Sequence, residues 1–236
     1  MKESLLALAG SLVLAGAQAF TPALERLFGR HSGSVANFGG GAGLAYVFLY
    51  LLLELIKDGA DKIHAFLPLG PEPLESLLIL LLAAVTAIYL LQLRLVKNPS
   101  PVDEYRGFAG FFLTYNLLAG AGLVEEARWG TVNLAVYSLA LGLHMAFNER
   151  MLLHLWPAHG WRCRTALAAA PVVGCALAAA LPLPEAMLYG MLTVIAGGTI
   201  ITVLRRELPD PRGLRPVAFI AGVAGYAALI MATWRY

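Results

Sequence analysis

The chain has 236 residues, of which 59% are hydrophobic and only 14% are Asp, Glu, Lys or Arg. Soluble domains usually carry about 25% charged residues, so this composition, with a mean hydropathy of +0.71, excludes an ordinary soluble enzyme and a disordered chain. The net charge of +2 is too small to indicate nucleic-acid binding, and two cysteines make neither a disulfide framework nor a zinc spacing. The composition is that of an integral membrane protein.

Apolar runs separated by charged or Pro/Gly-rich breaks predict an all-α membrane protein with eight transmembrane helices in one polytopic domain. The clearest breaks are residues 57–75, rich in proline and glycine, and residues 97–106. The predicted helices cover approximately residues 4–20, 36–56, 75–93, 107–124, 131–153, 165–181, 186–204 and 215–234.

The basic residues predict how the chain is oriented. Twelve of the 17 Lys and Arg residues fall in or beside the first, third, fifth and seventh connections, and five at the opposite ends. The positive-inside rule then places both termini outside a plasma (inner) membrane. Ala17-Gln18-Ala19 is similar to a signal-peptidase site, but cleavage there would leave Arg26 and Arg30 outside. We therefore expect the first helix to remain uncleaved.

Polar residues at membrane depth concentrate in the fourth and fifth predicted helices, as Tyr115 and Asn116 in one and His144, Asn148 and Glu149 in the other. His144 and Asn148 are four residues apart and share a helix face. The short connection makes the two helices neighbours, with Asn116 and His144 at similar depth. These residues predict a site for a cation or a small polar solute, with interhelical hydrogen bonding that fixes the packing as the alternative. Glu149 is either part of that site or a helix-end charge.

Three acidic residues at the predicted outer side have two interpretations each. Glu54, at the outer end of the second helix, is either a carboxylate at the mouth of a path or a helix-end charge. Glu125 and Glu126 are either a solvated face or a group that attracts cations.

A weak internal echo links the second and seventh helices. Glycines 39–41 precede an apolar run that ends at Glu54, and glycines 197–198 precede one that ends at Glu207. The two helices run in opposite directions, and inverted repeats of this kind are typical of transporters with a site near the midplane. Close packing of helices through glycine is the alternative.

Two segments carry a family resemblance. The fourth helix reads Tyr115-Asn116-Leu117-Leu118-Ala119-Gly120, and the fifth reads His144-Met145-Ala146-Phe147-Asn148-Glu149. They resemble the motifs His-Asn-x-x-Glu/Asp-Gly and His-Glu-x-Pro-His-Glu of the Zrt/Irt-like (ZIP) metal transporters. The matching positions are Asn116, Gly120, His144 and Glu149. The second and seventh helices resemble that family too, through the segments Phe48 to Glu54 and Ala196-Gly197 to Glu207-Leu208-Pro209-Asp210.

The resemblance implies a 3+2+3 arrangement with inverted pseudo-symmetry, in which the fourth and fifth helices form the central pair. It implies a transporter rather than an enzyme, which moves a divalent cation of the zinc, iron or manganese class. The implied ligands are an eroded set with one imidazole and one carboxylate: His144, Asn116, Asn148, Glu149 and Tyr115. The cation would be cargo and not a resident cofactor. The expected partners are the lipid bilayer and this ion; a homodimer is left open, and no nucleic acid is expected.

Two other classes of function remain as alternatives. One is a carrier for a non-metal solute, or a ZIP-fold protein that does not transport. The other is an intramembrane protease, because His144-x-x-x-Asn148 matches one motif of the CAAX-type membrane proteases. The remaining motifs of those proteases do not match, since Arg128 follows Glu125-Glu126 two positions early and no Phe-x-x-x-His precedes His144.

Overall fold

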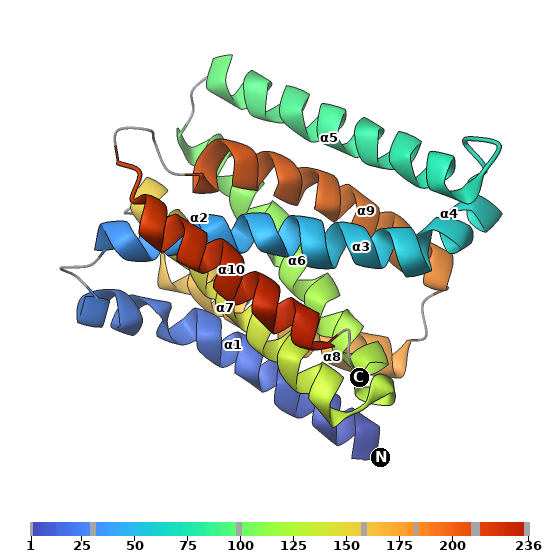
Figure 1. Cartoon of the computed structure of the whole chain (residues 1–236), viewed down its shortest axis with the longest axis horizontal. Helices are drawn as coiled ribbons and strands as arrows, with labels where there is room; N and C mark the ends of the chain where they lie inside the picture. The colour runs from blue at the N-terminus through green and yellow to red at the C-terminus, as the bar shows by residue number, and fades with distance from the viewer. Residues whose placement is uncertain are drawn as a thin grey trace.

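A computed structural model of the chain describes residues 2–28, 32–97, 101–156, 160–181, 184–208 and 213–233. The described residues form a bundle of long helices and contain no β-strand (Figure 1). The helices are α1 (Lys2–Phe28), α2 (Ser32–Tyr46), α3 (Leu52–Glu54), α4 (Ala60–Phe66), α5 (Pro73–Lys97), α6 (Pro101–Trp129), α7 (Thr131–Leu155), α8 (Trp161–Ala180), α9 (Glu185–Thr202) and α10 (Pro216–Thr233). Two π-helical turns, Val47–Leu51 and Leu55–Gly59, join α2, α3 and α4 into one rod, and a third, Val203–Glu207, extends α9.

The length and apolar character of the helices indicate an integral membrane protein. Among the described residues, six helical segments are long and apolar enough to cross a bilayer. They are Glu3–Ala23, Gly33–Phe66, Pro73–Leu91, Tyr105–Arg128, Trp161–Ala180 and Glu185–Arg205. The described part of α10 contributes a shorter apolar helix, Pro216–Ala232. Membrane crossing by α7 and α10 stays a prediction.

Each of the eight predicted segments coincides with one helix or one rod of joined helices. The second is wrong at its end, because the rod continues past residue 56 to Phe66. Charged residues such as Lys57 and Asp58 end an apolar run but do not break a helix, whereas Pro68 and Pro71 do. The predicted last residue of the eighth segment, Trp234, lies outside the described residues.

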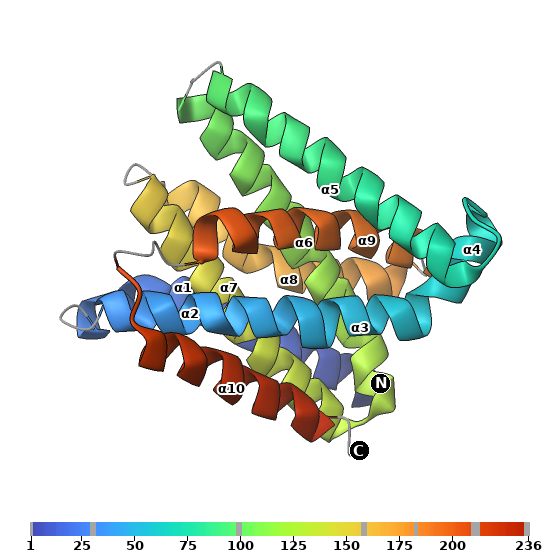
Figure 2. The same cartoon turned by 45° about the horizontal axis from the view of Figure 1, so that its top comes forward.

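The main packing partners are pairs of helices that are distant in sequence. α2 packs on α10, α5 on α9, α6 on α8 and α1 on α7 (Figures 1 and 2). Glycine makes the closest approaches possible: a Cβ on Gly41 would overlap the Phe219 carbonyl oxygen, and one on Gly222 the carbonyl oxygen of Phe38. The same holds between α6 and α8, where a Cβ on Gly174 would overlap the Leu117 carbonyl oxygen.

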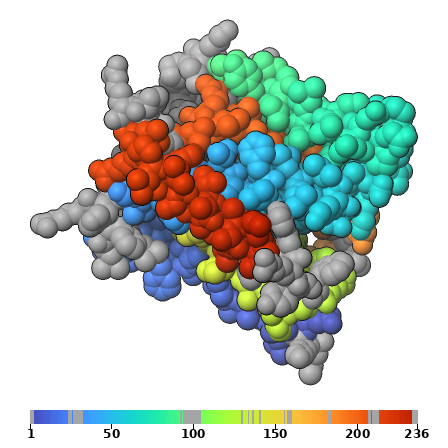
Figure 3. Space-filling view, in the orientation of Figure 1, coloured from blue at the N-terminus to red at the C-terminus, as the bar shows by residue number. Residues whose placement is uncertain are grey.

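The ends of the bundle have different character. The N-terminal end of α1 and the C-terminal end of α10 lie together at one end (Figures 1 and 2). The C-terminal end of α1 and the N-terminal ends of α2 and α10, which flank arginine-containing connections, lie at the other. In the space-filling view α10 runs along α2 on the surface (Figure 3). Large apolar side chains are exposed on the outer helices, for example Leu82 of α5 and Val217 of α10, as expected for helices that face lipid.

Candidate functional site

The five residues predicted as metal ligands are all buried in the middle of the bundle. Tyr115 and Asn116 lie on α6, and His144, Asn148 and Glu149 lie on α7, with exposed fractions between 0% and 3%. α6 and α7 are in contact, as the short connection predicts. The structure divides these residues among three arrangements that sequence reasoning did not separate.

The first arrangement is a hydrogen-bonded network that links four helices. The Asn116 side-chain amide donates to the Gln18 side-chain oxygen of α1 at 2.7 Å and to the Leu167 backbone oxygen of α8 at 2.9 Å. Gln18 in turn donates to Glu149 at 3.4 Å. The other carboxylate oxygen of Glu149 accepts from Nε of Arg164 at 3.0 Å. A buried carboxylate is thereby held by a guanidinium and an amide.

Proline creates one of the acceptors in this network. Pro171 lies inside α8 and has no backbone N–H to donate to the carbonyl of residue 167, four positions earlier. The Leu167 oxygen is therefore free to accept the Asn116 amide. Membrane helices tolerate proline where a neighbouring helix satisfies the freed carbonyl in this way.

The second arrangement is a pair of polar side chains without partners. Nδ1 of His144 and both polar atoms of the Asn148 amide are buried and make no hydrogen bond. The two residues are one turn apart on α7 and share a face. Buried polar groups that lack a partner are costly at membrane depth and call for a bound water, ion or solute.

The third arrangement is an aromatic layer above His144. The imidazole stacks on the ring of Tyr46, with centroids 4.4 Å apart, and meets the edge of Tyr115 at 5.6 Å. The hydroxyl groups of Tyr46 and Tyr115 are hydrogen-bonded at 2.6 Å. This Tyr46–Tyr115 pair, which joins α2 to α6, separates His144 from a cavity on the far side.

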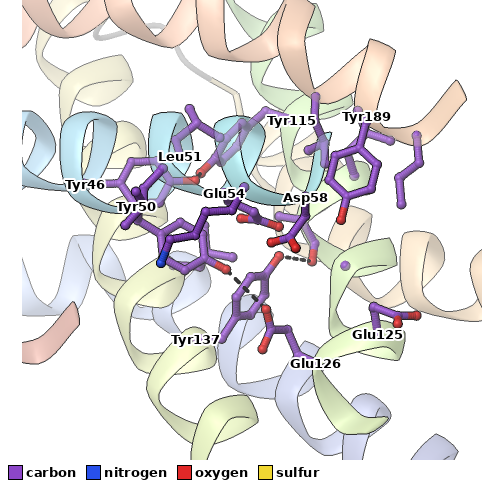
Figure 4. A pocket seen from close by; sticks show the side chains of 18 of the residues that line it. Tyr46, Tyr50, Leu51, Glu54, Asp58, Tyr115, Glu125, Glu126, Tyr137 and Tyr189 are labelled. Atoms are coloured by element: carbon purple, nitrogen blue, oxygen red, sulfur yellow. Dashed lines mark hydrogen bonds between the residues drawn. The ribbon is translucent and has the colours of Figure 1, made fainter. Parts of the chain in front are cut away.

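That cavity, which we call the tyrosine cavity, has a volume of about 500 Å³. Figure 4 shows it between α3, α6, α7 and α9. Tyr46 and Tyr115 both line it, and Tyr115 is the one predicted ligand among its lining residues. The other polar lining residues are Tyr50, Glu54, Lys57, Asp58, Lys62, Glu125, Glu126, Tyr137, Glu185 and Tyr189.

The acidic residues with two interpretations fall on this cavity. Glu54, Glu125 and Glu126 all line it, and Glu126 accepts a long hydrogen bond from the Tyr50 hydroxyl at 3.4 Å. The Tyr137 hydroxyl donates to the Ala119 backbone oxygen at 3.2 Å. Glu125 and Glu126 were expected in a connection, but α6 continues to Trp129 and carries them on its last turns.

Sequence reasoning missed several residues of these arrangements. Gln18 was considered only as part of a signal-peptidase pattern, and Arg164 only as a connection charge, although it lies on α8. A glutamine inside an apolar run is costly in a membrane, and this alone could have marked Gln18. Tyr50 and Tyr137 were not predicted as site residues, although Tyr137 is one of the polar residues of the fifth predicted helix.

Among the described residues, no three His, Cys, Asp or Glu side chains are grouped as a metal centre. The predicted ligand set holds fewer such groups and relies on amide and phenol oxygens. Comparison with known proteins adds no family: no protein-family model matches the chain, and a search of curated proteins finds no match.

Proposed function

We propose that the protein is a ZIP-like membrane transporter that carries a divalent cation between α6 and α7. The observation that carries this proposal is the unpartnered pair on α7. His144 offers an imidazole nitrogen and Asn148 an amide oxygen, both buried and both without a hydrogen bond. Imidazole and oxygen ligands suit zinc, iron and manganese. A site with so few charged ligands holds its ion weakly, and transport needs an ion that is also released.

The surroundings of this pair are consistent with a route for the ion. On one side the tyrosine cavity carries carboxylates that attract cations to the Tyr46–Tyr115 pair. On the other side lies Glu149, one residue beyond Asn148 and already engaged with Arg164. We propose that the ion passes the tyrosine pair, is held by His144 and Asn148, and leaves on the side of Glu149. By the positive-inside rule the cavity faces outside and the termini lie there as well.

The pairing of helices supports an inverted repeat. The inverted repeat would relate α1 to α8, the rod that begins with α2 to α9, α5 to α10, and α6 to α7. Under this exchange, the contact between α2 and α10 corresponds to the contact between α9 and α5. The same exchange converts α1–α7 into α8–α6, so each main packing pair has a counterpart. The glycines of the second and seventh helices also have equivalent contacts under this exchange. Gly41 approaches the α10 backbone, and Gly197 approaches the backbone of α5 at Val85. This regularity supports eight membrane crossings, including α7 and α10, in the 3+2+3 arrangement.

Uptake into proteoliposomes tests the proposal. The purified protein should carry at least one of zinc, iron, manganese and cadmium into liposomes at a rate above that of empty liposomes. His144→Ala should abolish this flux, whereas His154→Ala, which removes an exposed histidine of the same helix, should leave it unchanged. Absence of flux for all four metals, or equal flux in both variants, would overturn the proposal.

A gain-of-function variant tests the alignment with the ZIP motifs separately. Tyr115→His combined with Ala119→Glu and Asn148→His rebuilds an imidazole-and-carboxylate shell and should raise zinc affinity sharply in calorimetry. If the variant folds and binds no zinc, the ZIP alignment is wrong. The polar residues of α6 and α7 would then act in packing, as in a ZIP-fold protein that does not transport.

A further inference from the structure

The tyrosine cavity has the size and chemistry of a small-molecule site. Its volume of about 500 Å³ falls within the roughly 300 to 1,000 Å³ that is usual for such sites, and it far exceeds the space that one metal ion with a few waters needs. It lies beyond the Tyr46–Tyr115 pair from His144, so the proposed metal ligands on α7 do not line it. Its function therefore needs an explanation of its own.

The lining of the cavity carries more acidic than basic side chains. Among the described residues, five with carboxyl groups and two lysines line it, and none of the lining residues is an arginine. Glu185 pairs with Lys62 at the rim, and Glu125 pairs with Arg128 at 2.8 Å outside the lining. The carboxylates of Glu54 and Asp58 point into the space (Figure 4). Walls of low dielectric strengthen the attraction of these groups for a positive ligand.

The aromatic lining narrows the class of cation. Five tyrosines line the cavity, and two contacts order three of their rings into one wall. The rings of Tyr46 and Tyr50 stack with centroids 5.6 Å apart, and Tyr50 meets Tyr137 at 5.7 Å with a 60° tilt. Ring faces attract organic ammonium groups, and aromatic walls beside a carboxylate are the usual way to bind quaternary ammonium ligands.

The protein already uses this chemistry at the rim of the cavity. The Lys62 ammonium lies 5.3 Å from the centroid of the Tyr189 ring and forms an ion pair with Glu185. An alkylammonium group is thus held there by one tyrosine face and one carboxylate. Tyr50, which is hydrogen-bonded to Glu126, and the adjoining Tyr137 bring aromatic rings and a carboxylate together in the same way.

We infer that the tyrosine cavity binds a small organic cation of the quaternary or alkylammonium class, with its charged head against the wall that Tyr50 and Tyr137 form and near the carboxylate of Glu54. Such a ligand sits on the route proposed for the divalent ion and competes with it. The inference concerns binding alone and does not depend on metal transport. A protein that carries no metal still binds the ammonium compound, and the two proposals fail in different experiments.

Equilibrium binding of radiolabelled choline to the purified full chain in detergent tests the inference. Choline should bind, and its uncharged isostere 3,3-dimethyl-1-butanol, which has the same shape, should fail to displace it. Tyr137→Leu should weaken choline about tenfold, as loss of one cation–π partner predicts, and Tyr137→Phe should retain the affinity because the ring remains. Glu54→Gln should weaken it by a similar factor.

Matched variants outside the cavity serve as controls. Tyr89→Leu removes a tyrosine on α5, and Glu72→Gln removes an exposed carboxylate before that helix; both should bind choline like the unmodified protein. If Tyr137→Leu does not fold, Glu54→Gln and the neutral isostere still decide the question.

Three results would overturn the inference. The first is that choline does not bind. The second is that the neutral isostere displaces choline as well as unlabelled choline does, and the third is that the cavity variants and the controls have the same choline affinity. If choline does not bind and manganese binding is lost in Glu54→Gln, the cavity serves only as the entrance of the metal route.

Discussion

The two sides of the Tyr46–Tyr115 pair have similar polar groups in different arrangements. On the cavity side, carboxylates and tyrosine hydroxyl groups surround open space. On the other side, Asn116, Gln18 and Glu149 belong to a closed network of hydrogen bonds, beside the unpartnered pair of His144 and Asn148. The difference shows where a ligand can enter and which part of the molecule holds the helices together. Variants in the closed network should therefore cost stability, and variants on the open side should change binding.

The largest effect is expected from Arg164→Ala. Glu149 has a side chain only 1% exposed, and Arg164→Ala removes the guanidinium that is paired with this buried carboxylate. Loss of one partner of a buried pair costs about 3 kcal/mol or more. Unfolding of the detergent-solubilised protein measures it.

Two further variants make this result specific. Arg162→Ala, which removes an exposed arginine two residues away, should change little. Adding Glu149→Gln to Arg164→Ala should restore part of the loss, because the amide carries no charge. Equal stability of Arg164→Ala and the unmodified protein would contradict the buried pair.

Much of this contrast lies beyond what hydropathy reveals. The all-helical class and the places of the helices follow from sequence, because a long apolar run can satisfy its backbone in a bilayer only as a helix. The concentration of polar residues on α6 and α7 also follows, since each such residue needs a partner. Which partner it finds does not follow: Gln18 and Glu149 are separated by 131 positions and meet only through the packing of α1 on α7.

The second prediction concerns the contact that aligns Asn116 with its acceptor on α8. A Cβ at Gly174 would overlap the Leu117 carbonyl oxygen of α6, so Gly174→Ala must push the two helices apart. Overpacking of this kind costs about 2 kcal/mol. Gly110→Ala is the matched control, because nothing lies within 4 Å of a Cβ at that position of α6. Similar unfolding curves for the two variants would contradict the close approach of α6 and α8.

The third prediction isolates a single link of the closed network. Gln18→Met keeps the length of the side chain but removes both its bond from Asn116 and its bond to Glu149. Leaving buried partners short of a hydrogen bond costs about 1 to 2 kcal/mol, which unfolding in detergent resolves. Thr21→Val should cost less, because that hydroxyl bonds only within its own helix, to the Ala17 carbonyl. A larger loss for Thr21→Val would place the network's stability elsewhere in α1.

The smallest change in stability is expected on the open side, at the rim of the tyrosine cavity. Lys62 and Glu185 are paired there with side chains 37% and 65% exposed, and such surface pairs contribute less than about 1 kcal/mol. Lys62→Met should therefore unfold almost like the unmodified protein. Its effect should fall on binding instead: it removes one of two ammonium groups and leaves Tyr189 and Glu185 to an incoming cation. Choline affinity should rise about threefold, by the energy scale of one exposed pair. A large loss of stability in Lys62→Met with unchanged choline affinity would mean that the rim stabilises the fold and does not affect binding. The contrast between the two sides of the Tyr46–Tyr115 pair would then be wrong.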